Sequence, residues 1–432
     1  MAQNGFVLDS NGAVLATLAA DVVSPQYRNG LVFDGVTGAL STTGLSGGLT
    51  PEQVAAVQVL VSGGGNLGPV AVQNVQFTNL KRWRAARAKV QGGASRAIYL
   101  SCGDSTTAGF GALSADSGFN SGYAYSVDAA ITAGLTVAGV AAQQNCFFGT
   151  HGVDPTERPT YDSRIALNGW IWDVALGSVG GRPYVSTTTT QRMTFASGLT
   201  FDSFRVFSAA VSRGVMTVDV DSSPPATGTA AIDQSAYDVF ISSPYTTTLA
   251  THTVGLTHTS GASVGVIGIE AWNSGVPAVS VIQGGQLGAK ASDINNPAGN
   301  PFSWNFINAA VAINPDIFRL MLTENDVTAG TDVETWKGLI RGILTPLQAL
   351  GTTLLLEDGF PASGQSAVTL AAYKAAVYAL ALEYGAMYLP MDASILSYED
   401  SNALGLYFDG GHPNRAGYAL RGRLIGQMLA TV

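Results

Sequence analysis

Residues 97–106 of this 432-residue chain are AIYLSCGDST, an apolar run that ends in a turn. A short apolar run without alternation is typical of a strand buried on both faces, as in a parallel sheet. Gly103 allows a tight turn, so we expect the strand to deliver Ser105 to the carboxyl edge of the sheet, where open α/β proteins place their ligands. Asp-Ser-Thr is also good helix-capping chemistry, and taken alone a plain capped turn explains the stretch equally well.

Strand and helix patterns alternate on both sides of a long central segment. The expected elements are a helix over 123–133, a strand near Val137, a strand over 317–322, a helix over 333–350, a strand over 352–356, a helix over 367–384 and a last helix after Pro413. Such alternation predicts a parallel sheet with helices on both faces. We therefore expect a three-layer α/β domain built from residues 96–154 and 275–432.

Residues 155–274 interrupt this alternation. They are rich in Thr, Ser, Val and Gly, and apolar residues alternate with polar ones, as in MTVDV at 216–220. Period-two alternation predicts strands with one buried face, so we expect an inserted antiparallel β-sandwich. Its tryptophans are explained equally well by burial and by contact with a carbohydrate; they are Trp170, Trp172 and Trp272.

The first 95 residues have a different texture. Up to residue 48, short apolar pieces are broken by Asn-Gly, Asp-Gly and Gly-Gly pairs, a pattern that predicts β hairpins. Thr50 and Pro51 are typical of a helix start, and a second helix is expected over 79–90. Nothing in residues 1–95 points to chemistry, so we expect an attachment or assembly region.

The composition excludes several function classes. A net charge of −9 and a pI near 4.9 argue against nucleic acid as the partner, because phosphate binding needs a basic surface. No run of about eighteen apolar residues occurs, so no membrane span is expected. The N-terminus has neither a basic region nor an apolar stretch typical of a secretory signal, and synthesis in the cytoplasm is the expectation.

The two cysteines, Cys102 and Cys146, bear on metals and on redox state. They allow one disulfide and no Cys-rich metal site. A pair of small buried thiols is the simpler interpretation. No metal or other cofactor is expected.

Asp409 and His412 stand three positions apart, about three hundred residues after Ser105. A catalytic base needs a held tautomer, and a carboxylate on the same turn can hold the second ring nitrogen. Together with a serine hydroxyl, these groups suit nucleophilic acyl transfer. The competing interpretation is a histidine that caps the last helix. The remaining histidines have no such partner nearby in sequence; they are His151, His252 and His258. The last two lie on one face of a predicted strand and are expected to be structural.

Asn325 follows the apolar run 318–322, so it should emerge at the end of a strand beside Ser105. An amide there can donate a hydrogen bond to an oxyanion. Gly285, which follows another apolar run, offers its backbone N–H as a second donor. Asp326 is expected to brace the loop.

Two further carboxylates, Glu324 and Asp358, support a runner-up chemistry. Paired as acid and base, they would suggest glycoside hydrolysis. No strong spacing supports that pairing.

The ordered blocks resemble those of the SGNH hydrolases, also called GDSL-type esterases. The matching segments are Gly103-Asp104-Ser105 for the nucleophile block, Gln283–Gly288 more loosely for the glycine block, Asn325-Asp326 for the asparagine block and Asp409–His412 for the closing Asp-x-x-His block. The resemblance implies that Ser105 is the nucleophile, His412 the base and Asp409 its orienter. It also implies an oxyanion hole made by the Ser105 N–H, the Gly285 N–H and the Asn325 side chain.

The match departs from the family pattern at two positions. Thr323 stands where the family usually has Gly, and Gln283 where it often has Asn. These departures put the loop geometry in doubt, and Gly284 or Gly288 could replace Gly285. The gap between the nucleophile and glycine blocks is longer than usual, which fits the inserted β segment.

A softer resemblance concerns the N-terminal texture, such as LVFDGVTGAL at 31–40, which is similar to esterases encoded with phage structural genes. It implies a virion-bound enzyme that removes O-acetyl groups from a polysaccharide. One alternative is a short-chain esterase, lipase or thioesterase of the same fold. Another is a non-catalytic receptor-binding or structural phage protein. The sugar is not specified, and a homo-oligomer or virion assembly is left open.

Overall fold

The computed structural model describes residues 72–112, 122–172, 177–209, 214–227, 230–234, 239–296 and 304–432, together with four short N-terminal strands. Those strands form an antiparallel sheet in the order β2-β1-β3-β4; they are β1 (Asn4–Leu8), β2 (Val14–Leu18), β3 (Leu31–Phe33) and β4 (Leu40–Ser41). The prediction of β structure in this part is therefore confirmed. The helix expected to begin at Thr50 lies outside the described residues.

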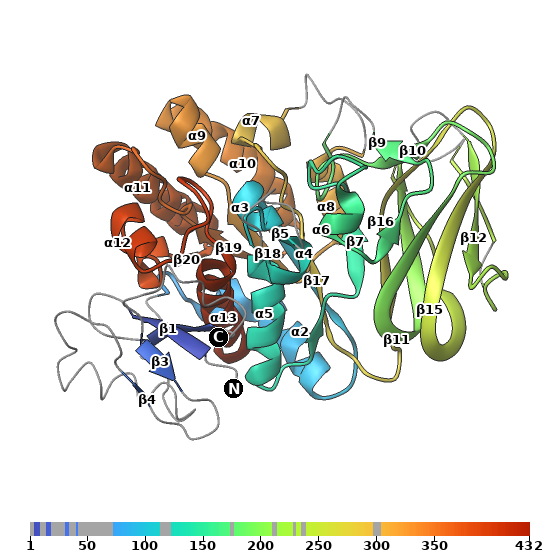
Figure 1. Ribbon diagram of the computed structural model, residues 1–432, viewed down its shortest axis with the longest axis horizontal. Coiled ribbons are helices and arrows are strands. Elements are labelled where there is room, and N and C mark those ends of the chain that lie inside the picture. Colours follow the sequence, from blue (N-terminus) through green and yellow to red (C-terminus); the bar gives the residue numbers. More distant parts are fainter. Residues whose placement is uncertain are drawn as a thin grey trace.

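The α/β domain is built on a six-stranded sheet in the order β20-β19-β18-β5-β17-β6 (Figure 1). Its strands are β5 (Ala97–Gly103), β6 (Ala142–Gln143), β17 (Val279–Ile282), β18 (Ile317–Met321), β19 (Thr353–Glu357) and β20 (Met387–Leu389). Every neighbouring pair is parallel, as the alternating strand and helix patterns predict. All carboxyl ends therefore meet at one edge.

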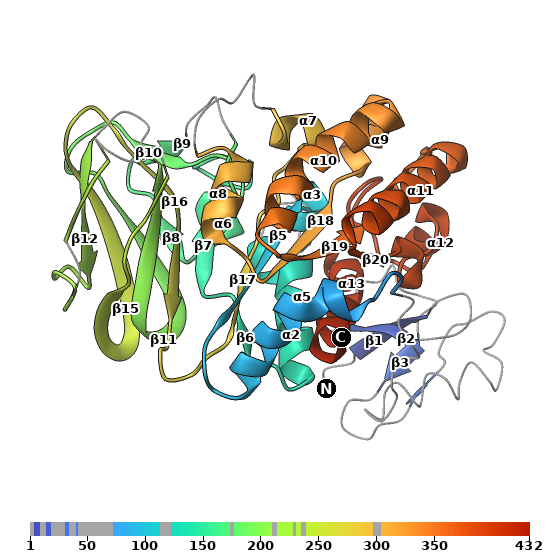
Figure 2. The ribbon, with the colours of Figure 1, turned by 180° about the vertical axis from the view of Figure 1, so that it is seen from behind.

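Helices cover both faces of this sheet (Figures 1 and 2). One face packs against α2 (Phe77–Gln91), α5 (Val127–Val137) and α13 (Arg415–Thr431). The other face packs against α8 (Phe306–Ile313), α10 (Val333–Ala349) and α11 (Ala367–Tyr384). Alternate residues of each strand enter the two cores: Tyr99 belongs to the first and Leu100 to the second. The predicted three-layer architecture is confirmed.

One expected strand is wrong. The helical pattern after residue 122 forms α4 (Gly122–Tyr125) and α5, and α5 continues through Val137, where a strand was expected. Ser126 caps α5, and Ile131 and Leu135 are buried at helical spacing, whereas Val137 is 81% exposed. The strand begins later, at β6, because this β-branched residue lies on the solvent face of the last helical turn.

The inserted segment forms a ten-stranded antiparallel sheet (Figure 1). Its strands are β7 (Cys146–Phe148), β8 (Ile165–Ala166), β9 (Ile171–Trp172), β10 (Tyr184–Ser186), β11 (Arg192–Ala209), β12 (Val215–Val220), β13 (Ala231–Asp233), β14 (Val239–Ile241), β15 (Tyr245–Ser260) and β16 (Val264–Trp272). The long strands β11 and β15 pair with each other, with a register shift between Ala196 and Thr200. We expected two stacked sheets, but these long strands connect the others into one continuous sheet. Most of its buried apolar residues form one core, whereas Phe148, Phe207 and Ile267 pack into the core of the α/β domain.

The antiparallel sheet is tied to the α/β domain at its β7 side. β7 pairs with β16, so the sheet includes residues before 155. At the same junction, the buried Glu270 carboxylate binds the guanidinium groups of Arg96 and Arg205. The Arg96 guanidinium also lies 3.7 Å from the centre of the Trp272 ring. The two domains thus share a buried ion-pair cluster.

The tryptophans of the insertion and the two cysteines all have contacts within the protein. Trp170 is buried, whereas Trp172 and Trp272 are partly exposed and each lies under an arginine guanidinium. Both cysteines are free and buried, and the Cys146 thiol donates to the Val281 carbonyl at 3.3 Å. The structure therefore shows two buried thiols and no disulfide between Cys102 and Cys146.

Candidate active site

The nucleophile turn is fixed by a cap that does not use Ser105. Ser105 begins the short helix α3 (Ser105–Ala108), and Asp104 is its N-cap. Asp104 Oδ1 accepts from the Thr106 N–H at 2.9 Å and from the Thr106 hydroxyl at 2.7 Å. At Gly103 a Cβ would lie 2.1 Å from Thr107 Oγ1 and 2.6 Å from the Met321 carbonyl. A side chain at position 103 would clash with these atoms, so glycine is required there. Because Asp104 provides the helix cap, the Ser105 hydroxyl takes no part in it and can bind other groups.

The structure brings Ser105, His412 and Asp409 into one hydrogen-bonded chain. Ser105 Oγ lies 2.9 Å from His412 Nε2. His412 Nδ1 lies 2.9 Å from each carboxylate oxygen of Asp409. Since the carboxylate can only accept, Nδ1 carries a proton and donates it to Asp409, and in the neutral ring Nε2 then accepts from the serine hydroxyl.

The loop that carries Asp409 and His412 is held by its own backbone. Asp409 Oδ1 accepts from the N–H groups of Gly411 at 2.8 Å and His412 at 2.7 Å. Partial burial works in the opposite direction, but these donors together with the His412 ring lower the pKa of Asp409. The Phe110 ring packs edge-on against the imidazole, 4.6 Å between centroids. The carboxylate is thus kept charged and the imidazole is kept in place.

Asn325 lies at the same sheet edge. β18 runs beside β5, with Met321 opposite Gly103, and Asn325 falls in the first turn of α9 (Glu324–Ala329). Its side-chain Nδ2 donates to the Ala289 carbonyl at 3.0 Å. An amide nitrogen carries two hydrogens, so this bond orients the group and leaves one N–H for a ligand.

The glycine block places Gly285 and Gly288 differently. Gly285 is buried, its carbonyl lies 2.8 Å from His151 Nδ1, and a Cβ there would lie 2.4 Å from the Ala108 nitrogen. It therefore packs against the end of α3 that is away from Ser105. Gly288 is exposed, has a φ of +70°, and directly precedes Ala289, the partner of Asn325.

The two departures from the family pattern have local partners. Gln283 donates from Nε2 to the Thr107 carbonyl at 2.7 Å and so braces α3. The Thr323 hydroxyl accepts from the Gly359 N–H at 2.7 Å. Both side chains therefore hold the loops of the site in place.

The sequence around His151 did not indicate that this residue lies next to the glycine block of the site. It is fully buried beneath Gly285, and burial lowers its pKa to about 3, so it is neutral. The other two histidines lie in β15: His252 Nδ1 contacts Asp221 Oδ2 at 2.6 Å, and His258 is buried beside Ser186. All three have structural partners, and only a three-dimensional contact could have revealed that of His151.

The remaining carboxylates differ in their surroundings. Asp326 braces the adjacent loop, as expected, because its Oδ2 accepts from the Ala291 N–H at 2.8 Å. Asp358 accepts from the Met391 N–H at 2.8 Å and the Tyr388 hydroxyl at 3.2 Å. Glu324 is buried beside Asp104 and Asp409. Among the described residues, no group of three or more His, Cys, Asp or Glu side chains could hold a metal ion.

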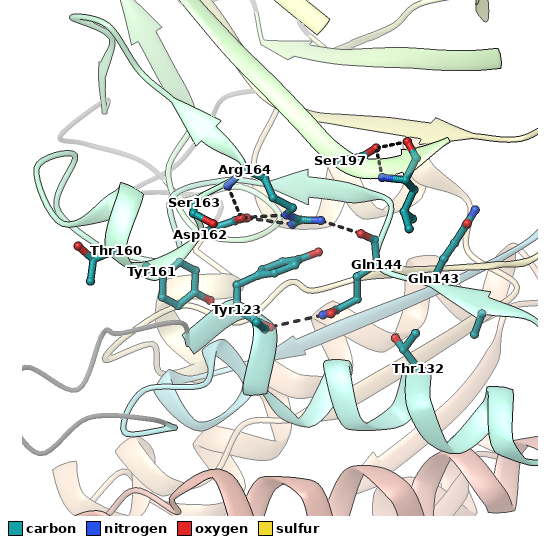
Figure 3. A pocket seen from close by; sticks show the side chains of 13 residues that line it. Tyr123, Thr132, Gln143, Gln144, Thr160, Tyr161, Asp162, Ser163, Arg164 and Ser197 are labelled. Carbon is teal, nitrogen blue, oxygen red and sulfur yellow. Dashed lines mark hydrogen bonds and ion pairs between the residues drawn. The ribbon is translucent and has the colours of Figure 1, made fainter. Parts of the chain in front are cut away.

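A separate cavity of about 480 Å³ opens between the two domains (Figure 3). Figure 3 shows Tyr123 and Thr132 on one side and Arg164 and Ser197 on the other. Arg164 is held by Asp162 and by the Gln144 and Cys146 carbonyls. The neutral polar side chains that line the cavity are Thr132, Gln143, Gln144, Thr160, Ser163 and Ser197.

Comparisons with known proteins identify similar sequences and folds. Residues 279–420 match the model of the GDSL-like Lipase/Acylhydrolase family. The α/β domain has the SGNH hydrolase fold. A peptidoglycan O-acetylesterase structure matches with a TM-score of 0.56 at 16% identity, covering 81% of this chain and 95% of that one.

Two further esterase structures overlap less of the chain. An acetyl-xylooligosaccharide esterase from Geobacillus stearothermophilus matches at 17% identity with a TM-score of 0.29, covering 36% of this chain and 74% of that one. A family two carbohydrate esterase from Cellvibrio japonicus matches at 12% identity with a TM-score of 0.28, covering 62% and 95%. No curated protein matches the sequence significantly. Among the described helices, none has the length and apolar character that a membrane span requires.

Proposed function

We propose that this chain is a serine esterase that removes O-acetyl groups from a polysaccharide. The observation that carries the proposal is the Ser105–His412–Asp409 chain of hydrogen bonds at the carboxyl edge of the parallel sheet. A hydroxyl, a base and a carboxylate that orients the base are the parts of a hydrolytic triad. The fold shared with a peptidoglycan O-acetylesterase supports the acetyl ester as the substrate class.

In the proposed mechanism, Ser105 Oγ attacks the acetyl carbonyl carbon while His412 Nε2 takes the hydroxyl proton. The tetrahedral intermediate collapses to an acetyl-enzyme, and His412 gives its proton to the departing sugar oxygen. Water then attacks the acetyl-enzyme while His412 takes its proton; the bond to Ser105 Oγ breaks, His412 returns the proton to that oxygen, and acetate leaves. Asp409 stays charged and stabilises the imidazolium in both halves, which its lowered pKa supports.

The oxyanion requires donors on the other side of the carbonyl. The Ser105 N–H and the second N–H of the Asn325 amide are two of them. For the third we assign Gly288 instead of Gly285, because Gly288 is exposed and adjoins the residue that holds Asn325. Gly285 is buried, and a Cβ on it would lie 2.4 Å from the Ala108 nitrogen, so it packs against α3.

The inserted domain has a proposed role in contacting the polymer. The lining of the cavity between the domains combines hydroxyl and amide groups with the Asp162–Arg164 ion pair and with apolar side chains, a mixture that suits a sugar with its hydroxyls and its apolar ring faces. The volume of the cavity falls in the usual range for ligand sites. Binding of acetylated oligosaccharides to the S105A variant should weaken severalfold when Gln143 and Ser163 are both changed to alanine. T188A, at an exposed site outside the cavity, is the matched control, and an equal effect of both changes would refute the role.

Attachment to a phage virion is a hypothesis that rests on the sequence texture of residues 1–95 alone. Its test is whether the chain copurifies with virions of a lysate and whether removal of residues 1–71 abolishes that association, because α2 packs in the core of the α/β domain and has to be kept. Copurification of the truncated chain would count against attachment through this region.

Acetate release from native polysaccharides tests the esterase proposal most broadly. We expect release from O-acetylated polymers and a preference for acetyl over octanoyl p-nitrophenyl esters. A preference for octanoyl esters would favour a lipase or thioesterase. Polysaccharide binding without any ester hydrolysis would favour the non-catalytic alternative.

A further inference from the structure

Glu324 is a buried carboxyl group that the proposed mechanism does not use. Only 8% of the residue is exposed, and its Oε2 atom has no hydrogen-bond partner. A Cβ placed on Gly411 would lie 2.9 Å from Glu324 Oε1. The carboxyl group is therefore directly in contact with the loop that carries Asp409 and His412.

The groups around Glu324 come from three other elements. Asp104 faces it from the cap of α3, and Asp409 faces it from the loop; within the described part of the chain, these are the charges that act on it, and both are negative. Two phenols lie near enough to be affected by it, Tyr407 before the loop and Tyr418 on α13. Their hydroxyls donate to backbone carbonyls, at 2.6 Å to Pro361 and 2.7 Å to Phe110.

This arrangement disfavours a charged Glu324. A buried carboxylate needs donors or a cation, and without them the group takes up a proton instead. Burial first, and then the negative charges of Asp104 and Asp409, raise the pKa of Glu324 well above its ordinary value. The neutral acid fills the space under Gly411 without adding a third charge beside the catalytic carboxylate.

We infer that Glu324 is a positioning residue, which supports the Asp409–His412 loop as a neutral acid and limits the esterase at alkaline pH when it loses its proton. This inference rests on the proposed function. The ionised form places a second negative charge against Asp409, which repels that carboxylate and disturbs the loop that aligns His412 with Ser105. The substitution E324Q keeps the shape of the side chain and cannot ionise.

The test compares pH profiles of kcat for p-nitrophenyl acetate, corrected for spontaneous hydrolysis. We expect E324Q to stay within about twofold of wild type near pH 7 and to retain activity at alkaline pH where wild type declines. E324A, which leaves a cavity under the loop, should lose roughly tenfold or more in kcat. E334Q, on an exposed part of α10, is the control and should follow wild type.

Two results would overturn the inference. One is an identical alkaline profile for wild type and E324Q. The other is a loss in E324Q at neutral pH as large as that in E324A, which would mean that the charged carboxylate is required.

Failure of the proposed function can be separated from failure of this inference by urea unfolding. Because the pKa of Glu324 is raised in the folded protein, its neutral form favours folding below about pH 4.5, and this contribution is lost as pH rises through the folded pKa. Wild type should therefore lose more stability than E324Q as pH rises from about 4.5 into the alkaline range, even if no ester is hydrolysed. Parallel curves for both proteins would refute a neutral Glu324.

Discussion

The α/β domain and the antiparallel domain treat charged side chains differently. Under the parallel sheet, Glu357 lies between two arginines with no exposure of any of the three: Nε of Arg319 is 2.6 Å from Oε1, and Nε of Arg421 is 2.9 Å from Oε2. In the antiparallel domain, the buried Glu270 carboxylate lies at the junction with the α/β domain, where it pairs with Arg205; farther from the junction, the pair Arg192–Asp219 is partly exposed and the core is apolar. Buried charges therefore fix strand and helix positions in the α/β domain and at the junction, whereas apolar packing dominates in the rest of the insertion.

The largest expected effect concerns the base. H412A should lower kcat for p-nitrophenyl acetate by about 10³-fold or more, and D409N should come close to it, because triad members act as a unit. Circular dichroism should show an unchanged fold, since both side chains are partly exposed. A D409N variant with full activity would show that the carboxylate does not hold the imidazole.

The two domains should also respond differently to loss of a buried group. E357A removes the carboxylate shared by two buried guanidinium groups and should cost about 3–5 kcal/mol of stability. F195A, in the core of the insertion, should cost a similar amount, about 3–5 kcal/mol. Only E357A should also lower kcat for a small ester, because Arg421 ties α13, which directly follows the Asp409–His412 loop, to the Leu389 and Pro390 carbonyls at the end of β20. Equal losses of kcat in the two variants would show that the domains work as one unit.

The oxyanion donor is expected to have a smaller effect than the base. N325D removes the donating amide and should lower kcat by about 10²–10³-fold with little change in KM. D326N, at the neighbouring bracing residue, is the control for loop disturbance. If D326N lost as much as N325D, the loss would come from the loop and not from a missing donor.

Some parts of the fold and of the site could be predicted from the sequence, and others could not. The bounds of α11 follow the sequence pattern because the helix starts at a serine cap and ends at Gly385. Asp409 and His412 could be paired from their spacing, whereas Ser105 could be joined to them only through the order of the blocks. The choice between Gly285 and Gly288 depends on which backbone is exposed, and the role of Glu324 depends on burial; neither leaves a local signal in the sequence.

The smallest expected effect is a pH dependence of the antiparallel domain. Burial opposes it, but hydrogen bonds to Asp221 and to the Thr248 carbonyl raise the pKa of His252 above its ordinary value of 6.5. The contribution to stability is therefore complete below pH 6.5 and is lost as pH rises through the folded pKa. The unfolding midpoint of this domain should fall slightly from about pH 6 to pH 8, and H252Q should remove that slope.

Substitution of Ser105 tests the central claim most directly. The measurement is the rate of acetate release from p-nitrophenyl acetate by S105A, with circular dichroism and the unfolding midpoint recorded on the same sample. We expect a loss of about 10³-fold or more in a protein that keeps its fold and its stability. An S105A variant that retains the wild-type rate would contradict the assignment of Ser105 as the nucleophile and, with it, the proposed esterase mechanism.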